Sequence, residues 1–331
     1  MRKNLPQNNF KKAFSLLELS IVILIISILI VGSMTASVTA ISNAKYKLTR
    51  DRMNELYKAI GNYLLVNKAL PCPAPITGLK ASDPNYGVAG NGGTCTNLTG
   101  VYTNAGSTIA YGMIPVQTLG LNTDMAEDGF GTKFTYAVAK AFTDPSVTTS
   151  DATGFGRASP SGIISVKESL NGVTTWQTNT NDAVLVIISH GNNQFGGFNN
   201  NSSSQNSASP DLAEQYNYGT SFAGSSVTLA TNFVSSAVNS DLFDDVLLYK
   251  TRNAILLDFN AMSLVVCRAT TTTDATCNNG AACNWAQTYY NQVAISSDSC
   301  STGYTSTVSK PTKRCGAFGT WESNYINPCT E

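Results

Sequence analysis

The 331-residue sequence contains one histidine, His190, which is the side chain most suited to acid–base chemistry near neutral pH. It follows an apolar run typical of a strand and stands between Ser189 and Gly191. A catalytic triad would also need a serine and an acid that the fold brings next to the ring, and no sequence pattern indicates such a pair. We therefore interpret His190 as a structural residue of a turn and predict no catalytic residue.

Two groups of acidic residues could form acid pairs or supply calcium ligands, because Ca²⁺ prefers carboxylate oxygens. One group is Asp244 and Asp245, and the other is Asp124, Glu127 and Asp128. Neither group has the alternating oxygen ligands of an EF-hand loop. We therefore expect both to be solvated turns, and we predict no metal site and no cofactor.

Eight cysteines could form disulfides or bind a metal. Zinc sites usually show CxxC pairs, which this sequence lacks, whereas cysteines outside the cytoplasm normally pair, so we predict disulfides. Cys72 and Cys95 stand apart from the rest, and we expect them to bridge each other across a polar loop. The other six indicate a separate disulfide-held C-terminal module, in which we assign no connectivity. They are Cys267, Cys277, Cys283, Cys300, Cys315 and Cys329.

The composition excludes several classes of function. The charged fraction of 13% is about half of the roughly 25% that soluble proteins show, and 21 basic residues balance 21 acidic ones. A net charge of zero offers no basic stripe, so we expect no nucleic-acid partner. The sequence has no HExxH, Walker or GxGxxG pattern, which argues against most metallohydrolases and nucleotide enzymes. Uncharged polar residues fill the stretch from about 75 to 310, as in exported proteins.

An unbroken apolar run covers Phe14–Met34 near the N-terminus. About 21 residues in a helix span the roughly 30 Å of a bilayer core, so this run predicts a membrane segment. The residues before it are basic and include no acid, which predicts a cytoplasmic N-terminus and a periplasmic or extracellular body. A cleaved signal peptide is the alternative, although Ala36 and Ala40 provide only a weak cut site.

Glu18 lies inside this apolar run. A charge in a membrane helix costs about 2.5–3.5 kcal/mol at the centre and less near the boundary. The carboxylate should therefore have a partner, unless it reaches the lipid headgroups.

The residues around Glu18, Lys11-Lys12-Ala13-Phe14-Ser15-Leu16-Leu17-Glu18-Leu19, resemble the processing site of type IV prepilins and of the pseudopilins of type II secretion. The resemblance implies cleavage between Ala13 and Phe14 by a membrane prepilin peptidase, which also methylates the new N-terminus. It places Glu18 at the fifth position of the mature chain. The family usually has Gly where Ala13 stands.

Further segments are similar to large pseudopilin-like proteins, so the resemblance covers roughly residues 11–255. The segments are Leu70-Pro71-Cys72-Pro73, 112–121 (GMIPVQTLGL), 128–131 (DGFG), 134–138 (FTYAV), 187–193 (IISHGNN) and 243–249 (FDDVLLY). The family usually has Trp where Phe130 stands. The Asn/Ser-rich insertion 193–210 interrupts the resemblance, and we expect it to be an exposed loop.

The pattern after the apolar run predicts that one helix continues from about residue 15 to 67. Apolar residues recur mostly at intervals of three, four, seven or eight residues, with charged residues between them. The predicted apolar stripe is Val38, Ile41, Leu48, Leu56, Ile60, Tyr63 and Leu64. Prolines at 71, 73 and 75 end the helix, because proline lacks the amide donor.

The rest of the sequence predicts short strands, which gives an α+β fold with the long helix packed on an antiparallel sheet. The expected strands are 101–119, 132–140, 183–189, 226–230, 245–249 and 253–266. We divide the chain into a leader (1–13), a membrane and assembly helix (14–34), its amphipathic continuation (35–70), a β-rich globular domain (71–260) and a cysteine-rich module (261–331).

The resemblance implies a non-enzymatic minor pilin or pseudopilin of a type IV pilus or type II secretion fibre. Its expected partners are the prepilin peptidase/methyltransferase, other pilin subunits and the bacterial inner membrane, with the body in the periplasm and, after assembly, at the cell surface. Glu18 would pair with the amine of Phe14 on a neighbouring subunit. The alternative is a surface adhesin or hydrolase with an uncleaved membrane anchor. The sequence does not distinguish a pilus from a secretion fibre.

Overall fold

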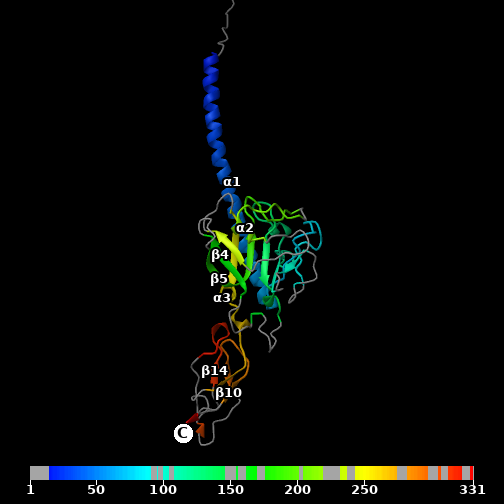
Figure 1. Ribbon diagram of the computed structural model, residues 1–331, viewed down its shortest axis with the longest axis vertical. Coiled ribbons are helices and arrows are strands. Elements are labelled where there is room, and N and C mark those ends of the chain that lie inside the picture. The colour runs from blue at the N-terminus through cyan, green and yellow to red at the C-terminus, as the bar shows by residue number, and fades with distance from the viewer. Residues whose placement is uncertain are drawn as a thin grey trace, which may run out of the picture. The chain divides into compact units, whose positions relative to one another are not determined.

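The computed structural model is shown in Figure 1. It describes residues 15–90, 95, 100–103, 108–145, 154–155, 162–169, 176–200, 204–218, 232–236, 243–273, 282–296, 305–306, 312–322 and 329–330. The chain divides into two compact units, Met1–Tyr46 and Lys47–Glu331.

The N-terminal helix α1 runs from Leu16 to Asn67, close to the predicted bounds. At its end Lys68 adopts the left-handed conformation (φ 58°), and its N–H still donates to the carbonyl of Leu64 at 2.7 Å. Pro71 and Pro73 follow and cannot continue a helix. The predicted helix and its termination are therefore confirmed.

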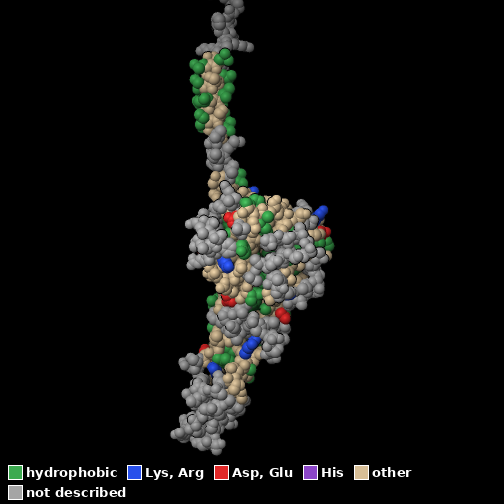
Figure 2. Space-filling model, viewed as in Figure 1, with side chains coloured by type: hydrophobic (Ala, Val, Ile, Leu, Met, Phe, Trp, Pro, Cys, Tyr) green, Lys and Arg blue, Asp and Glu red, His purple; other side chains and the backbone are tan. Residues whose placement is uncertain are grey.

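Residues 15–30 of α1, in the first unit, expose their apolar side chains on all sides of the helix. Every residue from 15 to 30 is exposed, and Figure 2 shows hydrophobic side chains around this part of α1. An apolar surface all round a helix needs other helices or lipid to cover it. Within the part of the chain that the structure describes, no helix has the length and apolarity required to cross a membrane. The predicted span at 14–34 therefore stays a prediction.

In the second unit α1 contributes one buried stripe to the main core. The stripe is Thr49, Met53, Leu56, Ile60 and Leu64. Its spacing of three and four residues keeps these side chains on one helix face. The prediction that Ile41 and Leu48 belong to this stripe was wrong, because they are 58% and 43% exposed.

Seven strands of the described residues form one sheet. They are β1 (Tyr102–Thr103), β2 (Ile109–Met113), β3 (Thr135–Ala139), β4 (Ile164–Ser169), β5 (Trp176–Ser189), β6 (Asn232–Ser236) and β7 (Val246–Thr251). The order is β1-β2-β3-β5-β4-β6, and β7 pairs with β5. All pairs are antiparallel except β4 with β6, which is parallel. The residues of β2 and β3 are completely buried, and they share the main core with α1.

The prediction of a strand at 253–266 was wrong. This segment contains the helix α3 (Arg252–Asp258) and a 3-10 turn at Met262–Leu264. Thr251 caps α3, because its hydroxyl accepts a hydrogen bond from the N–H of Ala254 at 3.2 Å. Strands β4 and β6 of the main sheet were not predicted, and the strand expected at 226–230 lies outside the described residues.

A close contact joins α1 to the segment after α3. A Cβ atom on Gly61 would lie 2.0 Å from the ring of Phe259, so glycine is the residue that lets this ring lie against the helix backbone. Phe259 also packs on Tyr57, with ring centroids 5.0 Å apart. The Tyr57 hydroxyl donates to Asp258 at 2.7 Å. These contacts fix α3 to α1.

The segment after α1 is held by a disulfide between Cys72 and Cys95, as predicted. The two Cα atoms are 5.3 Å apart, and both residues are buried in the main core. The bridge closes a loop whose ends are 23 positions apart in the sequence.

The described residues of the C-terminal part form four two-stranded sheets. They pair β8 (Val266–Cys267) with β11 (Thr288–Tyr289), β9 (Thr270–Thr273) with β10 (Ala282–Trp285), β12 (Val293–Ile295) with β14 (Thr312–Arg314), and β13 (Thr305–Ser306) with β15 (Cys329–Thr330).

Disulfides hold this part of the chain. Cys267 is bonded to Cys315, and Cys283 is disulfide-bonded as well. A small core contains Cys283, Trp285 and Ala294, with Trp321 packed against it. A disulfide-held C-terminal region is therefore confirmed. Cys277, Cys300 and the side chain of Cys329 lie outside the described residues.

A fully buried lysine ties β3 to the loop after α1. The Nζ atom of Lys133 donates to the carbonyls of Ile76 (3.1 Å) and Leu79 (3.3 Å), and it lies 5.5 Å from the centre of the Tyr86 ring. Burial lowers the pKa of Lys133 to about 8. The folded chain therefore gives up this proton at a lower pH than the unfolded chain does.

This pKa predicts a pH dependence of stability. Between pH 8 and about 10.4 the unfolded chain binds more protons at this site than the folded chain, so the free energy of unfolding should rise with pH. The Lys133→Met variant should lack this rise. The free energy of unfolding of wild type should therefore increase relative to that of the variant as the pH rises. Urea unfolding of both proteins at several pH values tests this. A difference between them that does not change with pH would contradict it.

Candidate functional site

Of the residues predicted for processing and assembly, the structure describes Glu18, whereas Ala13 and Phe14 lie outside the described residues. The Oε2 atom of Glu18 accepts a hydrogen bond from the N–H of Ser15 at 3.1 Å. The Ser15 hydroxyl accepts one from the N–H of Leu17 at 3.3 Å. Both bonds satisfy N–H groups in the first turn, and they cap the start of α1. Glu18 is also exposed, so its carboxylate can reach a second partner.

The second candidate site lies at one end of β3 and β5. It contains Asp128, from the loop before β3, and His190, which follows β5. Asp128 of the DGFG motif is 3% exposed, so the prediction of a solvated turn was wrong for it. Its Oδ1 accepts the N–H groups of Phe130 (2.8 Å) and Thr132 (2.9 Å), and its Oδ2 accepts the hydroxyls of Thr132 and Ser189, both at 2.6 Å. Four donors explain why this carboxylate tolerates burial.

Asp124 and Glu127 differ from Asp128. Asp124 remains exposed, with a carboxylate oxygen 3.7 Å from the guanidinium of Arg52. Glu127 is partly buried. Burial raises the pKa of the Glu127 carboxyl, and the positive charge of Arg52 opposes this.

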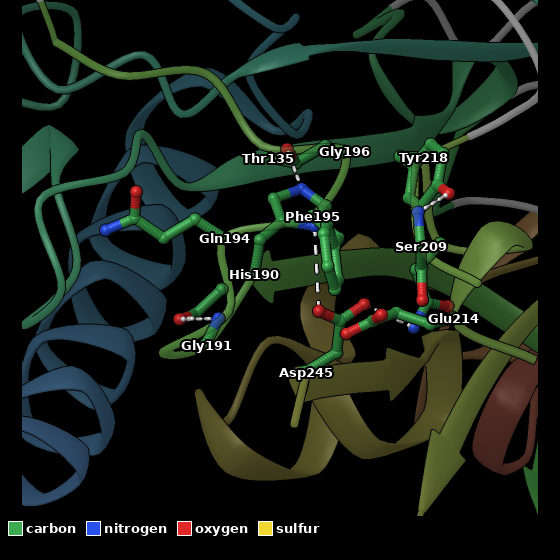
Figure 3. A network of polar contacts seen from close by, with 12 residues as sticks. Thr135, His190, Gly191, Gln194, Phe195, Gly196, Ser209, Glu214, Tyr218 and Asp245 are labelled. Carbon is green, nitrogen blue, oxygen red and sulfur yellow. Dashed lines mark hydrogen bonds and ion pairs between the residues drawn. The ribbon is translucent and has the colours of Figure 1, made fainter. Parts of the chain in front are cut away.

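His190 follows β5 and is completely buried. Figure 3 shows its ring between Thr135 and Asp245. Its Nε2 atom lies 3.0 Å from the Thr135 hydroxyl, and its Nδ1 atom lies 3.7 Å from Oδ1 of Asp245. The second distance is too long for a hydrogen bond but allows an ion pair. Burial lowers the pKa of His190, but the carboxylates of Asp245, Asp128 and Glu214 outweigh it, so the pKa is raised.

Thr135, His190 and Asp245 lie in the order hydroxyl, imidazole, carboxylate that a catalytic triad uses. All three are buried, with Thr135 and His190 at 0% exposure. A substrate therefore has no access to the Thr135 hydroxyl. The Ser189 hydroxyl donates to Asp128 and is equally buried. This arrangement supports a structural role for His190.

Asp244 and Asp245 precede β7 and are 5% and 4% exposed, so the prediction of a solvated turn was wrong here too. The Oδ2 atom of Asp244 accepts the N–H groups of Asn192 (2.7 Å) and Asn193 (3.0 Å). The Oδ2 atom of Asp245 accepts the side-chain amide of Asn217 at 2.8 Å. Segments distant in the sequence cover the pair.

Glu214 completes this cluster and was not predicted. It belongs to the short helix α2 (Leu212–Gln215), which Asp211 caps by accepting the N–H groups of Ala213 and Glu214. Glu214 is fully buried, and burial together with the charge of Asp245 raises its pKa to about 8. The spacing of Asp211 and Glu214 is typical of a helix start, but it carries no signal for burial.

Part of the Asn/Ser-rich segment 193–210 forms one wall of the site, so the prediction of an exposed loop was wrong for the buried residues 196–198 and 209, whereas residues 204, 207, 208 and 210 are exposed. Phe198 and Ser209 are buried. Gln194 donates from its side chain to the carbonyl of Phe130 at 2.8 Å, and the Asn206 side-chain amide donates to the carbonyl of Gln194 at 3.1 Å. Polar side chains here satisfy backbone groups inside the fold.

One group of acidic side chains among the described residues is close enough to hold a metal ion. Glu214, Asp244 and Asp245 each offer one oxygen, and these oxygens lie within 4.8 Å of one another. A groove of about 490 Å³ opens beside Asp245, between α1 and β7. Its lining residues include Arg50 and Asn54 of α1 and Tyr249 of β7.

Comparison with known proteins identifies the N-terminal segment. Residues 8–34 match the family model described as the prokaryotic N-terminal methylation motif. No curated protein and no solved structure matches the chain. The matched residues contain the predicted cleavage position and Glu18. The chain therefore carries a prokaryotic N-terminal methylation motif, consistent with the type IV pilin and pseudopilin family.

Proposed function

We propose that this protein is a non-enzymatic minor pilin or pseudopilin, a subunit of a type IV pilus or a type II secretion fibre. The methylation motif at residues 8–34 carries the proposal. Prepilin peptidase would cleave between Ala13 and Phe14 and methylate the new terminus. The subunit would wait in the bacterial inner membrane with its body in the periplasm.

The exposed apolar surface of residues 16–30 supports this role, because fibre assembly would bury it against the same helix of other subunits. The size of the chain, 331 residues, favours a rare subunit over the repeating shaft. The hydrolase alternative gains no support from the described residues, since the Thr135, His190 and Asp245 side chains are inaccessible.

Mass spectrometry of the membrane-extracted protein tests the processing step. We expect a mature chain that begins at N-methylated Phe14. Ala13→Gly should be processed in the same way, because the family usually has glycine there, and Ala13→Gln should retain the leader because the peptidase requires a small residue. An intact Met1 in wild type, or a cut near residue 40, would overturn the proposal.

A further inference from the structure

Strand β7 lies at an edge of the seven-stranded sheet. Residues 185–188 of β5 pair with β3 and with β7 at once, so these two strands lie on opposite sides of β5. Among the described residues β7 pairs with β5 alone, and no further backbone group bonds to residues 246–249. One row of N–H and C=O groups of β7 therefore has no strand partner in the described part of the chain.

The other two edges of the described sheet are protected in ways that β7 is not. Strand β1 has two residues, and three of the five residues of β6 are asparagine or serine. Native sheets use short, polar or charged edge strands to avoid pairing with other chains. Strand β7 begins with four apolar residues, and its lysine, Lys250, is held by Asp258 at 2.8 Å. This edge is therefore suited to pairing with another chain.

The groove beside Asp245 follows this edge. Residues 246–249 all line it. Successive side chains of a strand point to opposite faces, so a groove on one face would be lined by every second residue. Lining by four consecutive residues places the groove along the backbone edge of β7. The helix α1 contributes the facing wall through Arg50, Met53 and Asn54.

The two charged residues of the groove differ in what they offer a partner. Asp245 is 4% exposed, accepts the Asn217 amide at 2.8 Å and lies 3.7 Å from the His190 ring. Arg50 is exposed, and no described residue forms an ion pair with it. An accessible cation beside an apolar strand complements a segment that carries a carboxylate among apolar residues.

We propose that the edge of β7 binds an extended segment of another protein, which joins the sheet as a further strand. The segment has apolar residues at alternate positions, which pack beside β7 and Met53, and an aspartate or glutamate that meets Arg50. In this mode of recognition backbone hydrogen bonds supply affinity, and alternate side chains supply specificity. The surface rests on the seven-stranded sheet and is independent of the fibre role.

Binding of a labelled peptide to the purified full chain in detergent micelles tests the proposal. The probe is an acetylated and amidated eight-residue peptide that alternates valine and threonine, with one aspartate near its middle. Fluorescence anisotropy should show saturable binding. A chain that does not bind this probe would overturn the proposal.

Two methylated peptides test whether the probe binds as a strand. One carries N-methyl groups on its odd positions and the other on its even positions. Alternate N–H groups point to opposite edges of a strand, so one peptide should bind about tenfold more weakly and the other like the probe. Equal binding of the two peptides would contradict strand addition.

Charge-reversal variants locate the segment. Arg50→Glu should bind the aspartate peptide about fivefold more weakly, and it should bind a matched lysine peptide more tightly than wild type does. Lys58→Glu, which reverses another exposed charge of α1 outside the groove lining, should bind both peptides as wild type does. Circular dichroism verifies that each variant is folded. Unchanged binding in Arg50→Glu, or an equal effect of Lys58→Glu, would refute this placement.

A second copy of the chain is the alternative occupant of this edge. Pairing of β7 with β7 of another copy would give a dimer that the probe peptide dissociates in sedimentation experiments. We expect the same sedimentation with and without the peptide. A dimer that the peptide dissociates would overturn the proposal of a different protein as partner.

Discussion

Replacing Glu18 with alanine is expected to leave cleavage after Ala13 intact while removing the protein from sheared or purified fibres. The carboxylate meets the Phe14 amine of a neighbouring subunit in the proposed assembly, and without it that amine would be buried unpaired. Breaking a buried ion pair by removing one partner is strongly destabilising, at about 3–5 kcal/mol. Such a loss would reduce incorporation by at least a hundredfold.

A control must separate this pairing from helix capping, because Glu18 also accepts the Ser15 N–H in the first turn of α1. Ser15→Ala removes the hydroxyl that accepts the Leu17 N–H in the same turn and leaves the carboxylate in place. It should cost about 1 kcal/mol and permit incorporation. Wild-type levels of Glu18→Ala in fibres, or an equal defect in Ser15→Ala, would refute the pairing.

The pairing also has a consequence for position in the fibre. A subunit at the extreme tip has no subunit ahead of it, so its carboxylate would meet no amine. The presence of Glu18 therefore favours a place close to the tip but not at its apex. Immunogold labelling of fibres tests this, and label spread evenly along the shaft would contradict it.

The double variant Cys72→Ala/Cys95→Ala is expected to lose about 3 kcal/mol of unfolding free energy. In the chain-entropy model this is the contribution of a bridge that closes a loop of this length, 23 positions in separation. Both sulfurs are buried in the main core, so packing losses add to it. Denaturant unfolding under non-reducing conditions measures the difference.

The bridge between Cys267 and Cys315 supplies the matched control. Its removal should lower the stability of the C-terminal sheets. It should leave the unfolding free energy of the seven-stranded sheet nearly unchanged, because these cysteines are not part of the main core. A Cys72→Ala/Cys95→Ala protein as stable as wild type would contradict the expected role of the bridge. An equal loss in both double variants would show that the two regions unfold together.

Local patterns in the sequence predicted the elements whose signals are local. The helix to Asn67 follows from its apolar periodicity and from the prolines after it, and the cores of β3, β5 and β7 follow from runs of β-branched and aromatic residues. The pairing of Cys72 with Cys95 follows from their isolation in the sequence. Each of these predictions needs only a short stretch of chain.

The errors arose where burial depends on distant segments. Residues 253–258 are apolar enough for a strand, but the Thr251 cap and the packing of Ile255 and Leu256 favour a helix. Asp244 and Asp245 look like turn residues in sequence, and they become buried because Asn192, Asn193 and Asn217 fold over them. Tertiary contacts of this kind leave no local pattern.

The buried stripe of α1 determines how the second unit would respond to mechanical load. A pull along the helix axis would load the contacts of Thr49, Met53, Leu56, Ile60 and Leu64 in parallel, as shear, rather than one after another. The chain leaving the helix then enters a covalently closed loop at Cys72. Traction on a fibre built from such subunits would therefore extract the helix from its domain only by breaking the whole interface at once.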